Sequence, residues 1–224
     1  MAPMLNILEK DYERASKILD LARVEYSIPK SEKQDSSNFI YVPSINLDVA
    51  KERTLLGKNW FDTQKALHSN NQKMLTLPEF REFLKYTREN HQDIYNEITE
   101  VRDPWRAEWL DADFKTKGKD LIVNYHVFDE NGKIVRNSEV LDKNTLMKDK
   151  TPGIDLEYWL NNSTEQGFPT KKTKSGDLYY WYPRKDDNSV ARFFAYSGRA
   201  YLFCDRDPSG RGSDLGVRAV KQRE

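Results

Sequence analysis

The chain contains 224 residues with 36 basic and 36 acidic side chains, a length that favours one elaborated domain. A hydrophobic content of 38% and an aromatic content of 12% exclude a disordered chain. The single cysteine excludes an internal disulfide and a cysteine-cluster metal site, and no apolar run approaches the roughly 20 residues that span a bilayer. No secretory signal is visible, so a cytoplasmic location is the default expectation. The balanced charge gives no reason to expect nucleic acid as a partner.

Residues 1–37 are predicted to form an N-terminal amphipathic helix and a polar linker. Apolar residues recur at three- and four-residue steps from Leu5 to Ala22, and a polar stretch then follows. The remaining residues, 38–224, are expected to form the main domain. They begin with an alternating stretch around Pro43, which predicts one strand interrupted by a bend or bulge.

Two helices and a hairpin are predicted in the middle of the chain. Thr76 and Glu79 have the spacing of a capping box, which predicts a helix that begins there. A second helix is predicted over residues 91–101. Two alternating runs flank the pair Asn131-Gly132, which favours a tight turn between two antiparallel strands. Residues 153–160 are a candidate for a short helix.

No catalytic or metal-binding constellation is visible in the sequence. His68, His91 and His126 are too far apart for a helix-spaced zinc pair. We find no nucleophile elbow and no phosphate-binding glycine loop. Cys204 lies in a strand-like run and is interpreted as a small core residue. The sequence therefore predicts a protein that is not an enzyme and that binds no cofactor and no metal.

The C-terminal part is unusually rich in aromatic residues, with nine of them between Tyr179 and Phe203. In a strand, alternate residues point to opposite faces. Ala200, Leu202 and Cys204 are small or apolar and suit the interior, whereas the interleaved residues are aromatic, acidic or glycine. This second set has the composition of a binding surface, although Tyr201 and Phe203 also fit an ordinary core. The net charge of +5 in residues 171–224 is too small to predict a ligand.

The stretch VARFFAYSGRAYLFCDRDPSGRGSDLGVRAV resembles the variable region of proteins diversified by retroelements, which have a C-type lectin fold. The closing LGVRAV is similar to the G-[FV]-R strand that ends this fold and that of formylglycine-generating enzymes. IYVPSINLDVAKERTLLGKNW and TLPEFREFL look like the fold's first strand and early helices. The resemblance covers about residues 38–220.

The resemblance implies an α+β fold of C-type lectin type whose variable ligand-binding region spans about residues 177–215. Diversification in this family excludes Lys, Glu, Gln, Met and Trp, and all the interleaved residues satisfy that rule. Trp181 does not, so it is interpreted as scaffold. The implied ligand contacts are Phe194, Tyr196, Gly198, Tyr201, Phe203, Asp205, Asp207, Gly210, Gly212 and Asp214, with Tyr180 and Tyr182 as further candidates.

The function implied is non-enzymatic binding of a variable ligand, with a protein as the expected partner and a monomer as the expected state. Two alternatives remain open. One is a carbohydrate-binding module in which Tyr180, Trp181 and Tyr182 stack on a sugar. The other is an enzyme of formylglycine-generating type, which the lone Cys204 disfavours because those enzymes use catalytic cysteines. The triplets of calcium-dependent lectins are not present in the sequence.

Overall fold

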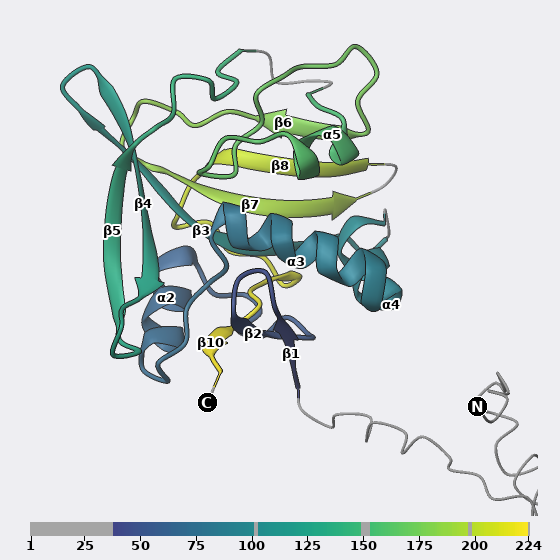
Figure 1. The fold of residues 1–224 in the computed structure, drawn as a ribbon. Coiled ribbons are helices and arrows are strands. Elements are labelled where there is room, and N and C mark those ends of the chain that lie inside the picture. Colours follow the sequence, from purple (N-terminus) through teal and green to yellow (C-terminus); the bar gives the residue numbers. More distant parts are fainter. Residues whose placement is uncertain (1–37, 101–102, 149–152, 197–198, 224) are drawn as a thin grey trace, which may run out of the picture. The chain divides into compact units, whose positions relative to one another are not determined.

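The computed structural model describes residues 38–100, 103–148, 153–196 and 199–223. They belong to one unit of the chain, Asn38–Glu224, which combines helices with two β-sheets (Figure 1). The predicted α+β class is confirmed. The helix and linker predicted over residues 1–37 lie outside the described residues.

The smaller sheet joins the two ends of the described chain. Its order is β1 (Phe39–Val42), β2 (Leu47–Ala50) and β10 (Val220–Gln222), and β2 pairs antiparallel with both neighbours. The prediction of one interrupted strand around Pro43 is therefore wrong. The chain reverses at a turn, where Asn46 has a φ of 55°, so each apolar run pairs with the other instead of continuing along one line.

Four helices are described: α2 (Trp60–His68), α3 (Leu77–Asn90), α4 (Gln92–Thr99) and α5 (Leu156–Asn161). The capping box predicted at the start of α3 is confirmed, because Thr76 and Glu79 each accept a hydrogen bond from the other's backbone N–H. The sequence did not predict α2. The short helix predicted from residue 153 begins three residues later, at Leu156, after an N-cap bond to Asp155.

The larger sheet has the order β5-β4-β3-β7-β8-β6, and β9 (Leu215–Gly216) pairs with β3. Its strands are β3 (Arg106–Lys117), β4 (Asp120–Phe128), β5 (Ile134–Val140), β6 (Leu178–Trp181), β7 (Ser189–Tyr196) and β8 (Arg199–Arg206). The predicted hairpin is confirmed as β4–β5, with Gly132 at a φ of 74° in its turn. β8 pairs antiparallel with β7 and parallel with β6.

Two hydrophobic cores lie on opposite faces of this sheet. On the first face, Leu202 and Phe193 pack with α3, and the Phe193 ring lies 5.1 Å from that of Phe80. On the opposite face, Trp109 and Val190 pack with Trp60 of α2 and with the C-terminal segment. Figure 1 shows α3 lying along β7, with α2 below β4. The second core covers β3 but does not extend across β8 and β6.

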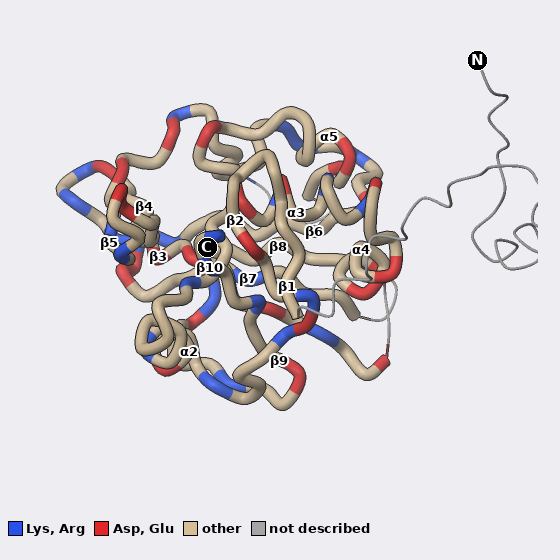
Figure 2. Tube along the Cα trace, turned by 60° about the horizontal axis from the view of Figure 1, so that its bottom comes forward, with Lys and Arg blue, Asp and Glu red and all other residues tan. Residues whose placement is uncertain are grey.

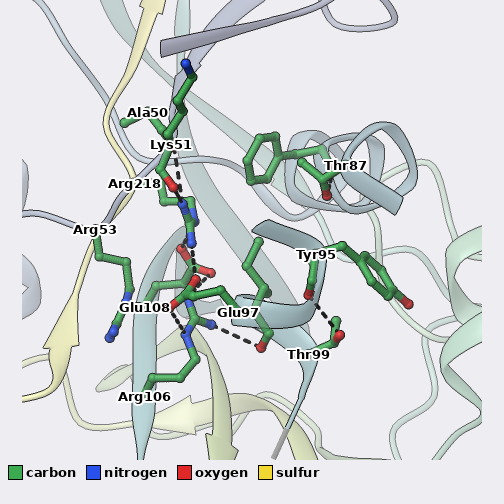
Figure 3. Close-up of polar contacts among 12 residues, drawn as sticks. Ala50, Lys51, Arg53, Thr87, Tyr95, Glu97, Thr99, Arg106, Glu108 and Arg218 are labelled. Carbon is green, nitrogen blue, oxygen red and sulfur yellow. Dashed lines mark hydrogen bonds and ion pairs between the residues drawn. The ribbon is translucent and has the colours of Figure 1, made fainter. Parts of the chain in front are cut away.

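Buried charges fix the C-terminal segment to the fold (Figure 3). Arg218, in the closing LGVRAV, is 1% exposed. Its guanidinium pairs with Glu97 of α4 and lies 3.1 Å from Glu108 of β3, and Arg106 donates to Glu108 at 2.9 Å. Arg53 bonds the carbonyl oxygens of Ala107 and Asp214. The segment LGVRAV, which resembles a single closing strand, is instead divided between β9 and the start of β10, and Arg218 between them anchors it.

Charges of both signs are interspersed along the chain around β10, as Figure 2 shows. No helix within the described ranges is long and apolar enough to cross a membrane.

Candidate functional site on the outer sheet face

Three neighbouring strands, β6, β8 and β7, carry a group of aromatic and arginine side chains on the side of the sheet away from α3. Because residues alternate along a strand, these side chains share one face while Leu202 and Phe193 enter the first core. We call this surface the aromatic face. It consists of Tyr179, Trp181, Arg192, Phe194, Tyr196, Arg199, Tyr201, Phe203 and Arg206.

The register of the three strands arranges the aromatic face in cross-strand rows. In one row Tyr201 lies between Tyr179 and Phe194, with ring centroids 5.5 and 5.4 Å away. In the next row Phe203 lies beside Trp181, with centroids 4.8 Å apart. Opposed side chains at these separations stabilise a sheet by direct contact. The rings therefore support one another without entering the first core.

The aromatic face begins where the second core ends. Phe194 packs against Trp105, with ring centroids 5.3 Å apart, at the margin of that core. Beyond it Tyr179, Trp181 and Tyr201 are partly exposed, and Tyr196 is 43% exposed. Half-exposed Tyr and Trp side chains offer large contact areas at little entropic cost. Among the residues that the structure describes, none covers this part of the sheet, so it offers a surface for a ligand.

The predicted alternation of buried and exposed side chains holds at the start of β8 and fails after Leu202. Ala200, Leu202 and Cys204 are buried, and Tyr201 is partly exposed, as predicted. Phe203 and Asp205 are each 8% exposed, so the expectation that they face solvent is wrong. The Phe203 ring is covered by Trp181 and by neighbouring guanidinium groups.

A register shift explains why Arg206, and not Asp205, follows Phe203 on the aromatic face. Arg192 of β7 pairs with Phe203 of β8, but Val190 pairs with Arg206. The interval is two residues long on β7 and three on β8, so β8 has one extra residue, a β-bulge. The bulge turns Arg206 onto the aromatic face, where its guanidinium lies 4.4 Å from the Phe203 centroid. Asp205 accepts a hydrogen bond from Arg206 Nε at 2.9 Å.

Three residues around β6, two predicted contacts and one predicted scaffold residue, do not lie where the sequence predicted them. Tyr180 is fully buried in the first core, and Tyr182 packs against the same core. Trp181, interpreted from the sequence as scaffold, lies instead on the aromatic face beside Tyr179. The alternation runs opposite to the expectation because Leu178 is buried, which fixes Tyr180 on the same side.

The loop after β8 also differs from the prediction. Ser209, Arg211 and Ser213 are exposed, whereas the predicted contacts Gly210, Gly212 and Asp214 are only partly exposed. A Cβ on Gly212 would lie 2.7 Å from Trp105 Cη2, so its backbone abuts the margin of the aromatic face. Asp207 is exposed, and its pKa is lowered by hydrogen bonds from the backbone and side chain of Ser209.

Phe194, Tyr196 and Tyr201 are thus the predicted contacts that the structure brings together on an accessible surface. Gly198 lies outside the described residues. The sequence reasoning missed Tyr179, Arg192, Arg199 and Arg206. Arg192 could have been predicted, because residues two apart on a strand share a face and Arg192 is two residues from Phe194. Nothing local in the sequence reveals the bulge that places Arg206 on the same face.

A cluster of polar side chains, separate from the aromatic face, connects α2 to the sheet. His126 Nδ1 lies 3.1 Å from Asp111 Oδ2, and Gln64 donates to Asp111 Oδ1 at 2.7 Å. The His68 ring lies 4.6 Å from that of His126, and burial followed by the charge of His126 lowers the pKa of His68. Both Asp111 oxygens are engaged, so the cluster holds α2 in place.

The described residues give little support for a catalytic pocket, a metal site or a reactive cysteine. A cavity of about 160 Å³ near the start of α3 is lined by Asp111, Tyr125 and Glu139, among others. Tyr125 donates to Glu139, and burial with this bond raises the pKa of Tyr125 to about 12. Nowhere in the described ranges do three His, Cys, Asp or Glu residues lie close enough together to hold a metal ion. Burial raises the pKa of the Cys204 thiol well above its ordinary value, so it is a poor nucleophile.

Comparison with models of protein families, with curated proteins and with solved structures finds no match to this chain.

Proposed function

We propose that the chain is a non-enzymatic binding protein that holds its ligand on the aromatic face. The observation that carries this proposal is the separation of the two faces of β6, β8 and β7. The inward residues Leu202 and Phe193 are 0% exposed in the first core, whereas Tyr201 and Tyr196 contact mainly other rings of the aromatic face. A side chain in such a position can change while the scaffold remains.

We further propose that the chain is a retroelement-diversified variable protein with a C-type lectin scaffold. The segments that carry this resemblance at the two ends of the domain pair with each other, because β2 pairs with β10 and Thr54 bridges Val217. The Tyr, Phe and Arg residues of the aromatic face belong to the residue types that diversification allows. Trp181 is the exception, which makes it a fixed member of the binding surface.

A library experiment tests the binding role. Tyr179, Phe194, Tyr196 and Tyr201 are randomised together in a displayed full-length chain, and the fraction of protease-resistant members is measured. We expect a substantial fraction to remain folded, because losing partly solvated ring contacts costs about 1–2 kcal/mol per site. The same library should yield binders to unrelated test proteins.

A matched control library randomises the inward residues Tyr180, Phe193, Leu202 and Cys204, all of which are 0% exposed. We expect few folded members, because each cavity or clash in a core costs about 1–5 kcal/mol. Equal survival of the two libraries would contradict the proposal. The gene offers a separate test of the lineage: a reverse transcriptase and a near-copy of the 3′ coding end that differs at adenines should lie beside it.

Carbohydrate binding is a second candidate, favoured by one observation. Trp181 and Tyr179 are partly exposed on β6, the last strand in the sheet order, with ring centroids 6.4 Å apart and an interplanar angle of 27°. Nearly parallel rings suit stacking on a sugar. Since Tyr180 is buried, this platform would use Tyr179, Trp181 and Tyr201. Glycan-array binding that disappears in Trp181→Ala, with proteins and peptides not bound, would favour this function over the first.

A further inference from the structure

Arg192 occupies an unusual position on β7, where the aromatic face adjoins the second core. Its guanidinium carbon lies 5.3 Å from the ring centroid of Phe194 and 5.2 Å from that of Phe203. Burial, followed by the charge of Arg206, lowers the pKa of Arg192 to about 10, while the charge of Asp205 acts in the opposite direction. Arg192 is therefore a partly desolvated cation held between two rings.

The charges around Arg192 are not balanced. Arg206 has a carboxylate partner, because Asp205 accepts its Nε–H at 2.9 Å. Apart from the two ring contacts, no described residue forms a hydrogen bond or ion pair with the side chain of Arg192, and its Nε is buried without an acceptor. A buried donor or charge without a partner costs free energy. An anion from outside the described residues would remove that cost.

A third arginine extends the positive charge along the aromatic face. Arg199 is exposed, and its guanidinium lies 4.4 Å from the ring centroid of Tyr179. With Arg192 and Arg206 it gives three guanidinium groups on the aromatic face, and of these Arg206 is paired with the carboxylate of Asp205. A partner that fits this surface has negative charge at matching positions.

The composition of the surface decides which kind of anionic partner fits best. Tyr, Trp, Phe and Arg are the side chains enriched where proteins bind proteins. A guanidinium matches the two oxygens of a carboxylate through paired N–H donors. On these grounds, and resting on the proposed function of the aromatic face, we infer that its ligand is an acidic protein segment, one carboxylate of which pairs with Arg192.

Selection from a displayed library of random peptides on the full-length chain tests this inference. We expect the recovered peptides to be enriched in Asp and Glu. Arg192→Gln should weaken their binding, measured by fluorescence anisotropy, roughly tenfold or more. Arg136→Gln is the matched control, because Arg136 lies on β5 with a side chain 58% exposed, and affinity should not change.

Amide versions of the peptides identify the pairing itself. Replacing the critical Glu by Gln should weaken binding to the original chain and leave binding to Arg192→Gln nearly unchanged, as expected for a direct pair in a double-mutant cycle. Arg192→Lys keeps the charge but loses the paired donors, so an intermediate affinity is expected. This variant also serves if thermal unfolding shows that Arg192→Gln does not fold.

The outcomes separate this inference from the proposed function. Peptides without acidic enrichment that lose binding in Tyr201→Asp but not in Arg192→Gln would overturn the inference and leave the proposed function standing. Peptides indifferent to both substitutions, or no peptides at all, would overturn both. Binding of single-stranded DNA or heparin, dependent on Arg192 and tighter than that of any recovered peptide, would replace the protein partner by a different polyanion.

Discussion

The comparison of Leu202→Ala with Tyr201→Thr tests the separation of scaffold from binding surface most directly. Leu202 is 0% exposed on β8, which lies between β7 and β6. Truncation of a buried leucine costs about 2–5 kcal/mol, and the central position favours the upper half of that range. For a domain of this size about 1 kcal/mol corresponds to roughly 2–4 °C, so we expect the melting temperature to fall by on the order of 10 °C.

The neighbouring residue is expected to behave differently. Tyr201 contacts the rings of Tyr179, Trp181, Phe194 and Phe203, but it is partly exposed, and Thr retains a preference for strands. Losing these partly solvated ring contacts should cost about 1–2 kcal/mol, a shift of about 2–8 °C. Thermal unfolding followed by circular dichroism measures both variants. Equal losses would show that Tyr201 belongs to the core and would refute the reasoning.

Three further predictions follow from individual contacts. Gly212→Ala should cost about 1–3 kcal/mol in denaturant unfolding and change tryptophan fluorescence, because its Cβ meets Trp105 at 2.7 Å; an unchanged spectrum would argue against this contact. Burial raises the pKa of Glu108, but the charges of Arg106 and Arg218 outweigh burial and lower that pKa. The stabilisation by Glu108 is therefore present above pH 4.5 and is lost as the pH falls through the lowered pKa. Glu108→Gln should destabilise the protein by about 3–5 kcal/mol at neutral pH, and the stability of the variant should fall less steeply at acidic pH. The pKa of His68 is lowered from 6.5, so the unfolded chain binds its proton first and stability should fall below that pH; a His68→Gln variant with the same fall in urea unfolding would contradict this.

Local signals predicted the elements that depend on neighbouring residues. The capping box at Thr76 set the start of α3, and the turn at Gly132 set the β4–β5 hairpin. The alternation in Ala200 and Leu202 correctly identified the inward face of β8. In each case the decisive interactions lie within a few residues of one another, so the sequence contains them directly.

Other features depended on contacts that no local pattern contains. The sequence did not predict β3. Its side chains are buried on both faces because a core lies on each side, and its buried residues include the charged Arg106 and Glu108, so it shows no alternation of apolar and polar residues. The register of β6 against β8 placed Trp181 outward and Tyr180 inward, opposite to the expectation. A shift of one residue reverses every side chain of a strand, and here the burial of Leu178 together with the pairing to β8 decides between the two orientations.

The sequence by itself determined that β8 separates a small apolar set, Ala200, Leu202 and Cys204, from an interleaved aromatic set, because a period of two residues is a property of any extended chain. The tertiary structure decided which members of the aromatic set reach the surface. The second core stops at Phe194 and, among the described residues, leaves the outer face of β8 and β6 uncovered, while the bulge in β8 adds Arg206 and encloses Phe203. Burial depends on what lies against a face, and in this protein those neighbours come from distant parts of the chain.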